Sequence, residues 1–293
     1  MVRMIGMVAL AAGLACAQGI EGTLDAPVLA TGGGRVLLLS AQGEVVWEHK
    51  AGNIHDAWLL PNGNVLFADG NVTEVTRGHE VVWTYKPENQ KGGGAYSCQR
   101  LPDGKTVVGE NASGRVVEVD GEGKVVFAVQ TRFESQNDHH HMRMARKLAN
   151  GNYLVCHSGD NVVREYRPDG TTAWEKKTKA LAFAAVRLPG GNTMVSSLDQ
   201  VTEYDPEGRE VWEFRKGDVP GVVIQNMTGI QVLPGGNLVA GCYGAYTKEG
   251  EGTGMFEVTR DKRLVWRYVS PGLRDKSMMG VHKQVAGGAA PLR

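Results

Sequence analysis

Short apolar runs separated by turn-forming residues recur along the whole chain. Val65–Phe67, Val107–Val108 and Tyr153–Val155 are three such runs, and each follows a glycine-containing turn. Apolar runs of this length bounded by turns are typical of β-strands. No stretch keeps the 3.6-residue apolar period of an amphipathic helix. The pattern therefore predicts an all-β protein.

A turn motif of Leu followed by Pro-Asn-Gly-Asn, or a close variant, occurs five times. Its copies are Leu60–Asn64, Leu101–Lys105, Leu148–Asn152, Leu188–Asn192 and Leu233–Asn237. Successive copies start 41, 47, 40 and 45 residues apart. Asn-Gly, Asp-Gly and Gly-Gly accept the positive φ angles of tight hairpin turns. The motif therefore predicts one hairpin in each repeat.

A second motif, an apolar residue followed by an aromatic one, closes each repeat. Its copies are Val82–Trp83, Val126–Phe127, Ala173–Trp174, Val211–Trp212 and Val265–Trp266. Each unit then contains four strands in 40–47 residues, which is the size of a propeller blade. We expect four-stranded antiparallel blades with the tryptophans packed on the outer strands.

The two ends of the chain predict how the ring closes. The chain begins with half a unit, Arg35–Leu39 and Val45–Trp47, and ends with the other half, Gly280–Val285 followed by Ala286–Gly288. Five whole units and two complementary halves make six blades, and pairing the N- and C-terminal segments in one blade removes the open sheet edges. The prediction is a six-bladed β-propeller occupying residues 18–293 as one domain.

Residues 1–17 have a different character. A basic Arg3, an apolar stretch over 4–14 and small residues up to Ala17 form the layout of a signal peptide. We expect an exported protein, periplasmic or extracellular. A lipoprotein anchored through Cys16 is the alternative. No later run is apolar enough to span a bilayer.

Charge and cysteine content narrow the function classes. The 293 residues carry 32 basic and 32 acidic side chains, without a basic block, so no nucleic-acid partner is expected. Three cysteines remain after residue 17, namely Cys98, Cys156 and Cys242. Their number is odd and their spacing is not that of a zinc site, so we expect small buried residues.

The closing and opening motifs together resemble the pyrroloquinoline-quinone-like propeller repeats. The segment 55–64, His-Asp-Ala-Trp-Leu-Leu-Pro-Asn-Gly-Asn, is especially similar to six-bladed bacterial arylsulfotransferases. That resemblance implies an enzyme in which a channel histidine accepts a sulfuryl group. Quinone-dependent relatives have eight blades and an adjacent cysteine pair, whereas this chain has neither, which argues against pyrroloquinoline quinone as cofactor.

The expected site lies at one end of the channel. In the predicted blades, the short hairpin turns share one face, and the longer connections share the other. These longer connections are 86–95, 130–138, 215–224, 243–253 and 270–276. Binding residues concentrate in such loops, and this face opens onto the central channel.

Six of the eight histidines fall in segments of this face. Histidine suits proton transfer, nucleophilic attack or metal ligation, and an arginine suits an anionic substrate. The predicted catalytic residues are His55, His141, Arg143 and His282. The predicted ligand-binding residues are Asp56, Tyr96, Glu110, Asn111, His140, His157, Asn226 and Tyr243. If residues 139–141 form a strand, His139 and His141 share a side and predict a divalent metal site.

These features favour a propeller that binds a small polar ligand, a carbohydrate or an anionic metabolite, at the channel mouth. Three alternatives stay open: an arylsulfotransferase-like enzyme, a metal-assisted hydrolase or lyase, and a cell-envelope scaffold that binds a protein on one face. A structural role is the alternative for these histidines, because a buried His or Asp can also stabilise the junction between two blades. Their convergence on one cavity would separate these interpretations.

Overall fold

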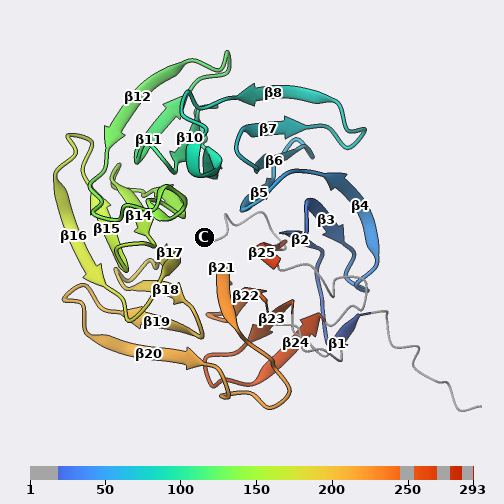
Figure 1. Ribbon diagram of the computed structural model, residues 1–293. Helices are drawn as coiled ribbons and strands as arrows, with labels where there is room; N and C mark the ends of the chain where they lie inside the picture. Colours follow the sequence, from blue (N-terminus) through green and yellow to red (C-terminus); the bar gives the residue numbers. More distant parts are fainter. Residues whose placement is uncertain (1–18, 245–253, 269–277, 286–292) are drawn as a thin grey trace, which may run out of the picture.

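The computed structural model describes residues 19–244, 254–268, 278–285 and 293. Six antiparallel sheets are arranged as blades around a central axis (Figure 1). Each innermost strand lies near the axis, and the C terminus is found in the middle of the ring. The predicted six-bladed, all-β propeller is confirmed.

Four blades are built from four consecutive strands each. These strands are β5 (Asp56–Leu59), β6 (Val65–Ala68), β7 (Val72–Val75) and β8 (Val81–Tyr85); β9 (Ala95–Arg100), β10 (Thr106–Glu110), β11 (Arg115–Val119) and β12 (Val125–Gln130); β13 (Met144–Lys147), β14 (Tyr153–His157), β15 (Val162–Tyr166) and β16 (Thr172–Lys177); and β17 (Ala182–Arg187), β18 (Thr193–Ser197), β19 (Gln200–Tyr204) and β20 (Glu210–Arg215). Two 3₁₀ turns, η1 (Lys91–Gly93) and η2 (Asp138–His140), lie in the connections that precede β9 and β13.

The closing blade joins the two ends of the chain. Its innermost strand is β25 (Met278–Lys283), which pairs with β2 (Val28–Gly32), followed by β3 (Arg35–Leu39) and β4 (Val45–Lys50). The C-terminal segment therefore contributes one strand and the N-terminal segment three, whereas the sequence predicted two from each. The turn motif did not identify β2 because its inner partner, β25, lies at the other end of the chain, so no Leu-Pro turn precedes β2. Residues 286–288, expected to form a turn, lie outside the described residues.

The last blade carries an additional strand. It consists of β21 (Asn226–Val232), β22 (Leu238–Tyr243), β23 (Met255–Val258) and β24 (Leu264–Tyr268), and β1 (Ile20–Gly22) pairs antiparallel with β24. The N-terminal segment thus contributes strands to two neighbouring blades. The expected signal peptide, including Cys16, and the connection 270–276 lie outside the described residues.

A repeated polar contact connects neighbouring blades and explains the final Asn of the turn motif. Asn64 donates to Glu74 Oε1 at 2.7 Å, and Glu74 Oε2 accepts from Arg100 of the next blade at 2.7 Å. The same glutamate position pairs with a cation of the following blade in four further units. These pairs are Glu118–Lys147, Glu165–Arg187, Glu203–Arg260 and Glu257–Lys283. We call these contacts the junction ladder.

The repeated tryptophans provide a second link between blades. In four blades the indole Nε1 donates to a backbone carbonyl in the outer turn of the next blade. These contacts are Trp47 to Arg77 (3.0 Å), Trp83 to Asp120 (3.2 Å), Trp174 to Pro206 (3.0 Å) and Trp212 to Arg260 (2.9 Å). The expected outer-strand packing is present, because each indole also lies against the hydrophobic core.

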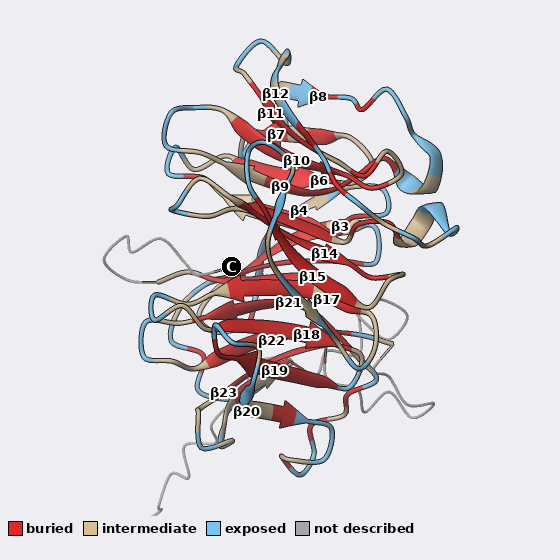
Figure 2. Cartoon of the chain, turned by 90° about the vertical axis from the view of Figure 1, so that its left-hand side faces the viewer, coloured by how far each residue is buried: buried red, intermediate tan, exposed pale blue. Residues whose placement is uncertain are grey.

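Burial distinguishes the strands of the disc from its loops. Buried strand residues fill the middle of the molecule, and exposed residues concentrate in the loops at both faces (Figure 2). Cys98, Cys156 and Cys242 are buried, as expected, and all three are free thiols. Within the described segments, no helix is long and apolar enough to cross a membrane.

Candidate functional site

Six residues, one from each blade, surround the channel at the same repeat position. In five blades this residue precedes the motif leucine by five positions, and Met279 has the same offset from Gln284. The six residues are His55, Tyr96, Arg143, Phe183, Thr228 and Met279. All six line the channel space at this level. We call them the channel ring.

Irregularities in the innermost strands supply four of these side chains. In β9, β17 and β25 the pairing register skips Tyr96, Phe183 and Met279, respectively. In β21 it skips the pair at Thr228 and Gly229. An extra residue opposite a regular strand re-aims its side chain. The bulges therefore direct these side chains into the channel. In a regular strand the same side chains would pack between neighbouring blades.

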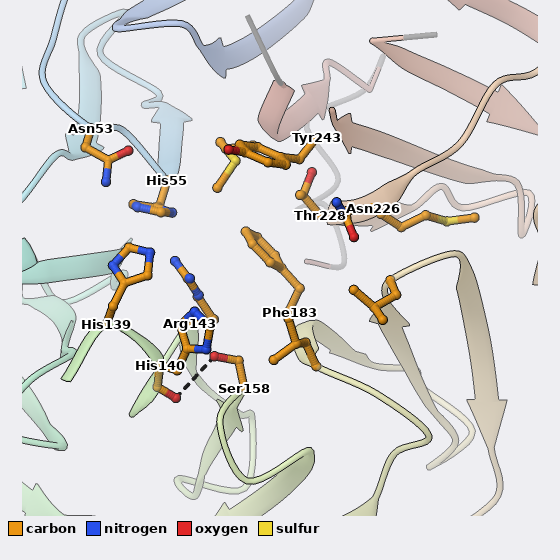
Figure 3. Close-up of a pocket in the computed structure, with 14 residues that line it drawn as sticks. Asn53, His55, His139, His140, Arg143, Ser158, Phe183, Asn226, Thr228 and Tyr243 are labelled. Atoms are coloured by element: carbon orange, nitrogen blue, oxygen red, sulfur yellow. Dashed lines mark hydrogen bonds between the residues drawn. The ribbon is translucent and has the colours of Figure 1, made fainter. Parts of the chain in front are cut away.

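Five residues of the channel ring, all except Tyr96, line a cavity of about 360 Å³, which we call the mouth cavity. Its wall is completed by residues from the adjoining loops and strand ends. These are Asn53, His139, His140, Ser158, Leu181, Leu198, Asn226, Met227 and Tyr243. They belong to the predicted long-connection face. In Figure 3, His55, His139 and Arg143 lie together, with Phe183 and Tyr243 across the cavity from them.

Arg143 is the positive charge of the mouth cavity. Its guanidinium lies 5.1 Å from the ring centre of Tyr96 and 5.7 Å from that of Phe183. Among the described residues its side chain has no carboxylate partner and no hydrogen bond. Arg146, three residues later, forms a 2.8 Å ion pair with Asp56. Arg143 is partly buried, and burying a cation without a paired anion costs free energy, so it is positioned to receive an anion.

His55 lies beside Arg143 and is also without polar partners. The side chain is 5% exposed, and neither ring nitrogen has a hydrogen bond among the described residues. Its ring packs against Tyr96 with centres 3.9 Å apart. Since a buried unsatisfied nitrogen costs free energy, His55 has the capacity to bond a ligand that enters the cavity.

The local contacts of His139 favour the tautomer with the proton on Nδ1. Tyr96 Oη donates to the carbonyl of Gly92, and His139 Nδ1 contacts both Tyr96 Oη and, at 3.4 Å, that carbonyl. A carbonyl only accepts, so the arrangement is satisfied when Nδ1 carries the proton. His139 Nε2 is then a free acceptor at the cavity.

Asn111 holds the loop that carries His139. Its Nδ2 donates to the carbonyls of Gly92 at 3.0 Å and of Asp138, while its Oδ1 accepts from Met142 N at 2.9 Å. The side chain is fully buried. Asn111, predicted as a ligand-binding residue, is thus placed behind the cavity, where it ties η1 to η2.

Burial and Arg143 keep the cavity histidines neutral. Burial, followed by the charge of Arg143, lowers the pKa of His55 well below its usual value, and the same two causes lower the pKa of His139 and of His140. Burial also lowers the pKa of Arg143. An arginine nevertheless stays protonated at neutral pH. The site therefore combines one cation with neutral imidazoles.

Three predicted histidines point elsewhere. His141 stacks on Phe133 with ring centres 3.9 Å apart, and its Nδ1 lies 3.1 Å from the carbonyl of Ala112. His157 bonds the carbonyl of His141 at 2.7 Å and Tyr166 Oη at 3.0 Å. His282 lies against Trp58. None of the three lines the mouth cavity.

Two predicted acidic residues are used in ion pairs. Asp56 accepts from Cys98 N at 3.0 Å and pairs with Arg146 and, at 3.3 Å, with Arg293. Glu110 pairs with Arg115 at 2.8 Å and accepts from Tyr85 Oη. These contacts belong to blade packing. The other predicted ligand-binding residues, Tyr96, His140, Asn226 and Tyr243, lie at the channel ring or the cavity wall.

His139 and His141, the predicted metal ligands, do not lie on one side of a strand. Residues Asp138–His140 form a 3₁₀ turn, so the side-sharing rule for a strand does not apply to His139 and His141. His139 faces the mouth cavity, whereas His141 lies on Phe133. In the described part of the chain, no group of three His, Cys, Asp or Glu residues is suited to hold a metal ion.

Sequence reasoning missed the apolar part of the site. Phe183, Leu198, Thr228 and Met279 were not predicted, although three of them occupy the ring position. Counting five residues back from each motif leucine identifies Phe183 and Thr228 as readily as His55. This position is occupied by residues of different chemical types, so the positions of the histidines alone do not reveal it.

Comparison with known proteins supports the repeat and the fold. The profile of the PQQ-like family described as outer membrane protein assembly factor BamB matches residues 10–147, just under half of the chain. No curated protein sequence matches the chain.

Solved structures extend the likeness over most of the molecule. A Bacteroides caccae protein of unknown function is 21% identical with a TM-score of 0.77, covering 92% of this chain and 99% of that chain. A streptogramin B lyase is 11% identical with a TM-score of 0.59, covering 86% and 83%. An inactive Staphylococcus aureus virginiamycin B lyase with quinupristin is 14% identical with a TM-score of 0.55, covering 85% and 87%. At these identities the likeness concerns the fold alone.

Proposed function

We propose that this chain is an exported β-propeller that binds a small anionic molecule in the mouth cavity. The observation that carries the proposal is Arg143, a partly buried cation in the cavity wall without a carboxylate partner among the described residues. The neutral histidines around it add hydrogen-bonding capacity without adding charge. A cavity of about 360 Å³ is in the range of small-molecule sites.

Titration with small carboxylates tests the proposal. We expect binding to the wild-type protein and a loss of about tenfold or more in affinity for Arg143→Gln, since charge-assisted bonds contribute about 1.5–3 kcal/mol. Arg77→Gln is the matched control, because Arg77 lies over Trp47 at the outer rim. Equal affinity in wild type and Arg143→Gln would contradict the proposal.

A histidine-dependent transferase of the arylsulfotransferase type is the second candidate. The tautomer of His139 favours it, because Nε2 is free to act as base or nucleophile beside Arg143. Sulfuryl transfer from a chromogenic aryl sulfate to a phenol is the assay. Transfer that disappears in His139→Ala and persists in His79→Ala would support catalysis, whereas absence of turnover favours binding alone.

A cell-envelope scaffold is a competing hypothesis for the same chain. The family profile is described as an assembly factor, and valines on several outer strands are exposed. These are Val45, Val46, Val81, Val82, Val126 and Val211. A scaffold that uses its rim has no requirement for Arg143, so the titration above also distinguishes these two functions.

A further inference from the structure

The wall of the mouth cavity is divided by chemistry. On one side lie Arg143, the three histidines His55, His139 and His140, and the polar Asn53 and Ser158. On the other side the blades containing β17, β21 and β25 contribute aromatic, leucine and methionine side chains. These are Leu181, Phe183, Leu198, Met227 and Met279. Figure 3 shows Phe183 projecting into the space opposite His55 and His139. The blade of β21 and β22 also contributes Asn226, Thr228 and Tyr243. A purely polar ligand would leave the five apolar side chains without matching groups.

Backbone strain supports the apolar side as a built feature. Leu198 has a φ of 41° in the turn between β18 and β19, a left-handed conformation that costs a leucine about 1–2 kcal/mol. Its carbonyl accepts a hydrogen bond from Met227 N, which joins two elements of the same wall. Glycine would adopt this conformation without cost, but it would contribute no apolar surface to the cavity.

The bulge in β17 gives a second, independent indication. Phe183 is the residue that the pairing register skips, and its ring lines the cavity with its centre 5.7 Å from the Arg143 guanidinium. A bulge next to a binding site re-aims a side chain. The chain thus places a large apolar side chain in the channel at the same level as its unpaired cation.

We infer that the ligand of the mouth cavity is an amphipathic monoanion whose charged head binds Arg143 and whose apolar body packs against Phe183 and Leu198. The inference rests on the proposed anion binding and adds the chemical class of the ligand. One cation among neutral imidazoles balances one negative charge. The opposite wall then buries an aromatic or branched apolar group of about the size of a phenyl ring.

Affinities of acetate, phenylacetate and phenylacetamide at pH 7 test the inference. Burial of the ring makes phenylacetate about tenfold to hundredfold tighter than acetate. Phenylacetamide, which lacks the charge, binds more weakly than phenylacetate. Phe183→Ala and Leu198→Gly lower the affinity for phenylacetate and leave that for acetate unchanged. Arg143→Gln lowers the affinity for both anions.

Leu198→Gly protects the test against misfolding, because glycine relieves the backbone strain. Its melting temperature is expected to equal or exceed that of wild type. Phe127→Leu, on the outer strand β12, is the matched control for loss of an aromatic ring. If acetate and phenylacetate bound equally well and both depended on Arg143, the ligand would not be amphipathic, but the proposed anion site would stand. Binding of neither anion would overturn the proposed function itself.

Discussion

At the residue scale, the molecule uses its histidines in two distinct ways. His157 is fully buried and both ring nitrogens are bonded, whereas His55 is buried with neither nitrogen bonded among the described residues. The first arrangement stabilises the blade of β13–β16 internally, and the second leaves bonding capacity at a cavity. Residue type and loop position alone did not separate these two roles.

His157 predicts how stability depends on pH. Burial lowers its pKa from 6.5 to about 4, so below pH 6.5 the unfolded chain binds a proton that the folded chain does not. The free energy of unfolding therefore falls by about 3 kcal/mol through this group as the pH drops from 6.5 to 4. Denaturant titrations between pH 7 and 4.5 should show a smaller decrease in His157→Asn. An unchanged slope in that variant would contradict the assignment.

The cavity histidines predict how ligand affinity depends on pH. A bound monoanion offsets the charge of Arg143, which contributes to the lowered pKa of His139 and His140. Their pKa therefore rises on binding, and protons are taken up with the ligand. Phenylmethanesulfonate, which stays ionised at pH 5, should bind about tenfold more tightly at pH 5 than at pH 7. Calorimetry in two buffers of different ionisation enthalpy measures the proton uptake, and none is expected in His139→Ala/His140→Ala.

At the element scale, the turn motif carries two functions. Its Pro-Gly turn closes the first hairpin of a blade, and its final Asn bonds the glutamate of the junction ladder. The closing blade has Leu38 at the glutamate position and Leu59 in the next blade, both in one apolar cluster. At this one junction, a pair of leucines thus takes the place of the glutamate and its cation.

The junction ladder predicts an unequal effect of two glutamate substitutions. Glu165 accepts from Asn152 and pairs with Arg187 while almost completely buried. Glu165→Ala should lower the free energy of unfolding by about 2 kcal/mol, because it removes a buried carboxylate and leaves its partly buried donors Asn152 and Arg187 unpaired. Glu210→Ala, which removes the exposed pair with Lys179, should cost less than about 1 kcal/mol. Similar losses in urea titrations would contradict a ladder role.

The repeat made the elements predictable, and local geometry limited the site prediction. Turn chemistry repeats in sequence, so blade number and strand order followed from it. The direction of His141, by contrast, depends on η2, a single 3₁₀ turn without an apolar period. The exposure of Phe183 to the channel depends on a bulge whose register is decided by neighbouring strands. Neither the 3₁₀ turn nor the bulge can be recognised from the composition of the chain or the spacing of its motifs.

At the scale of the whole molecule, closure joins residues at opposite ends of the chain. Ala30 of β2 lies opposite Val281 of β25. Bringing such distant segments together costs loop-closure entropy before any contact is gained. We therefore expect this pairing to form late in folding, after the consecutive blades.

Val281→Ala tests that order of events. The side chain is 1% exposed, and its truncation should cost about 2 kcal/mol of stability. Because the contact forms late, the loss should appear as an unfolding rate about 30-fold higher with a nearly unchanged folding rate. Val195→Ala, inside β18, should slow folding instead. Stopped-flow kinetics with equal slowing in both variants would contradict late closure.

The pairing of β1 with β24 shows that the rim of a blade accepts a further strand. The rims at β4, β8, β12, β16 and β20 have no such partner in the described part of the chain. Three of these strands carry charged residues, among them Glu48 and Lys50 in β4, Glu175 and Lys177 in β16, and Glu210 and Arg215 in β20, whereas β8 and β12 carry none. Charges on an open edge oppose strand addition by another molecule. At β4, β16 and β20 the outer charges therefore keep separate copies of the chain from extending one another's sheets, which leaves β8 and β12 as the edges open to such addition.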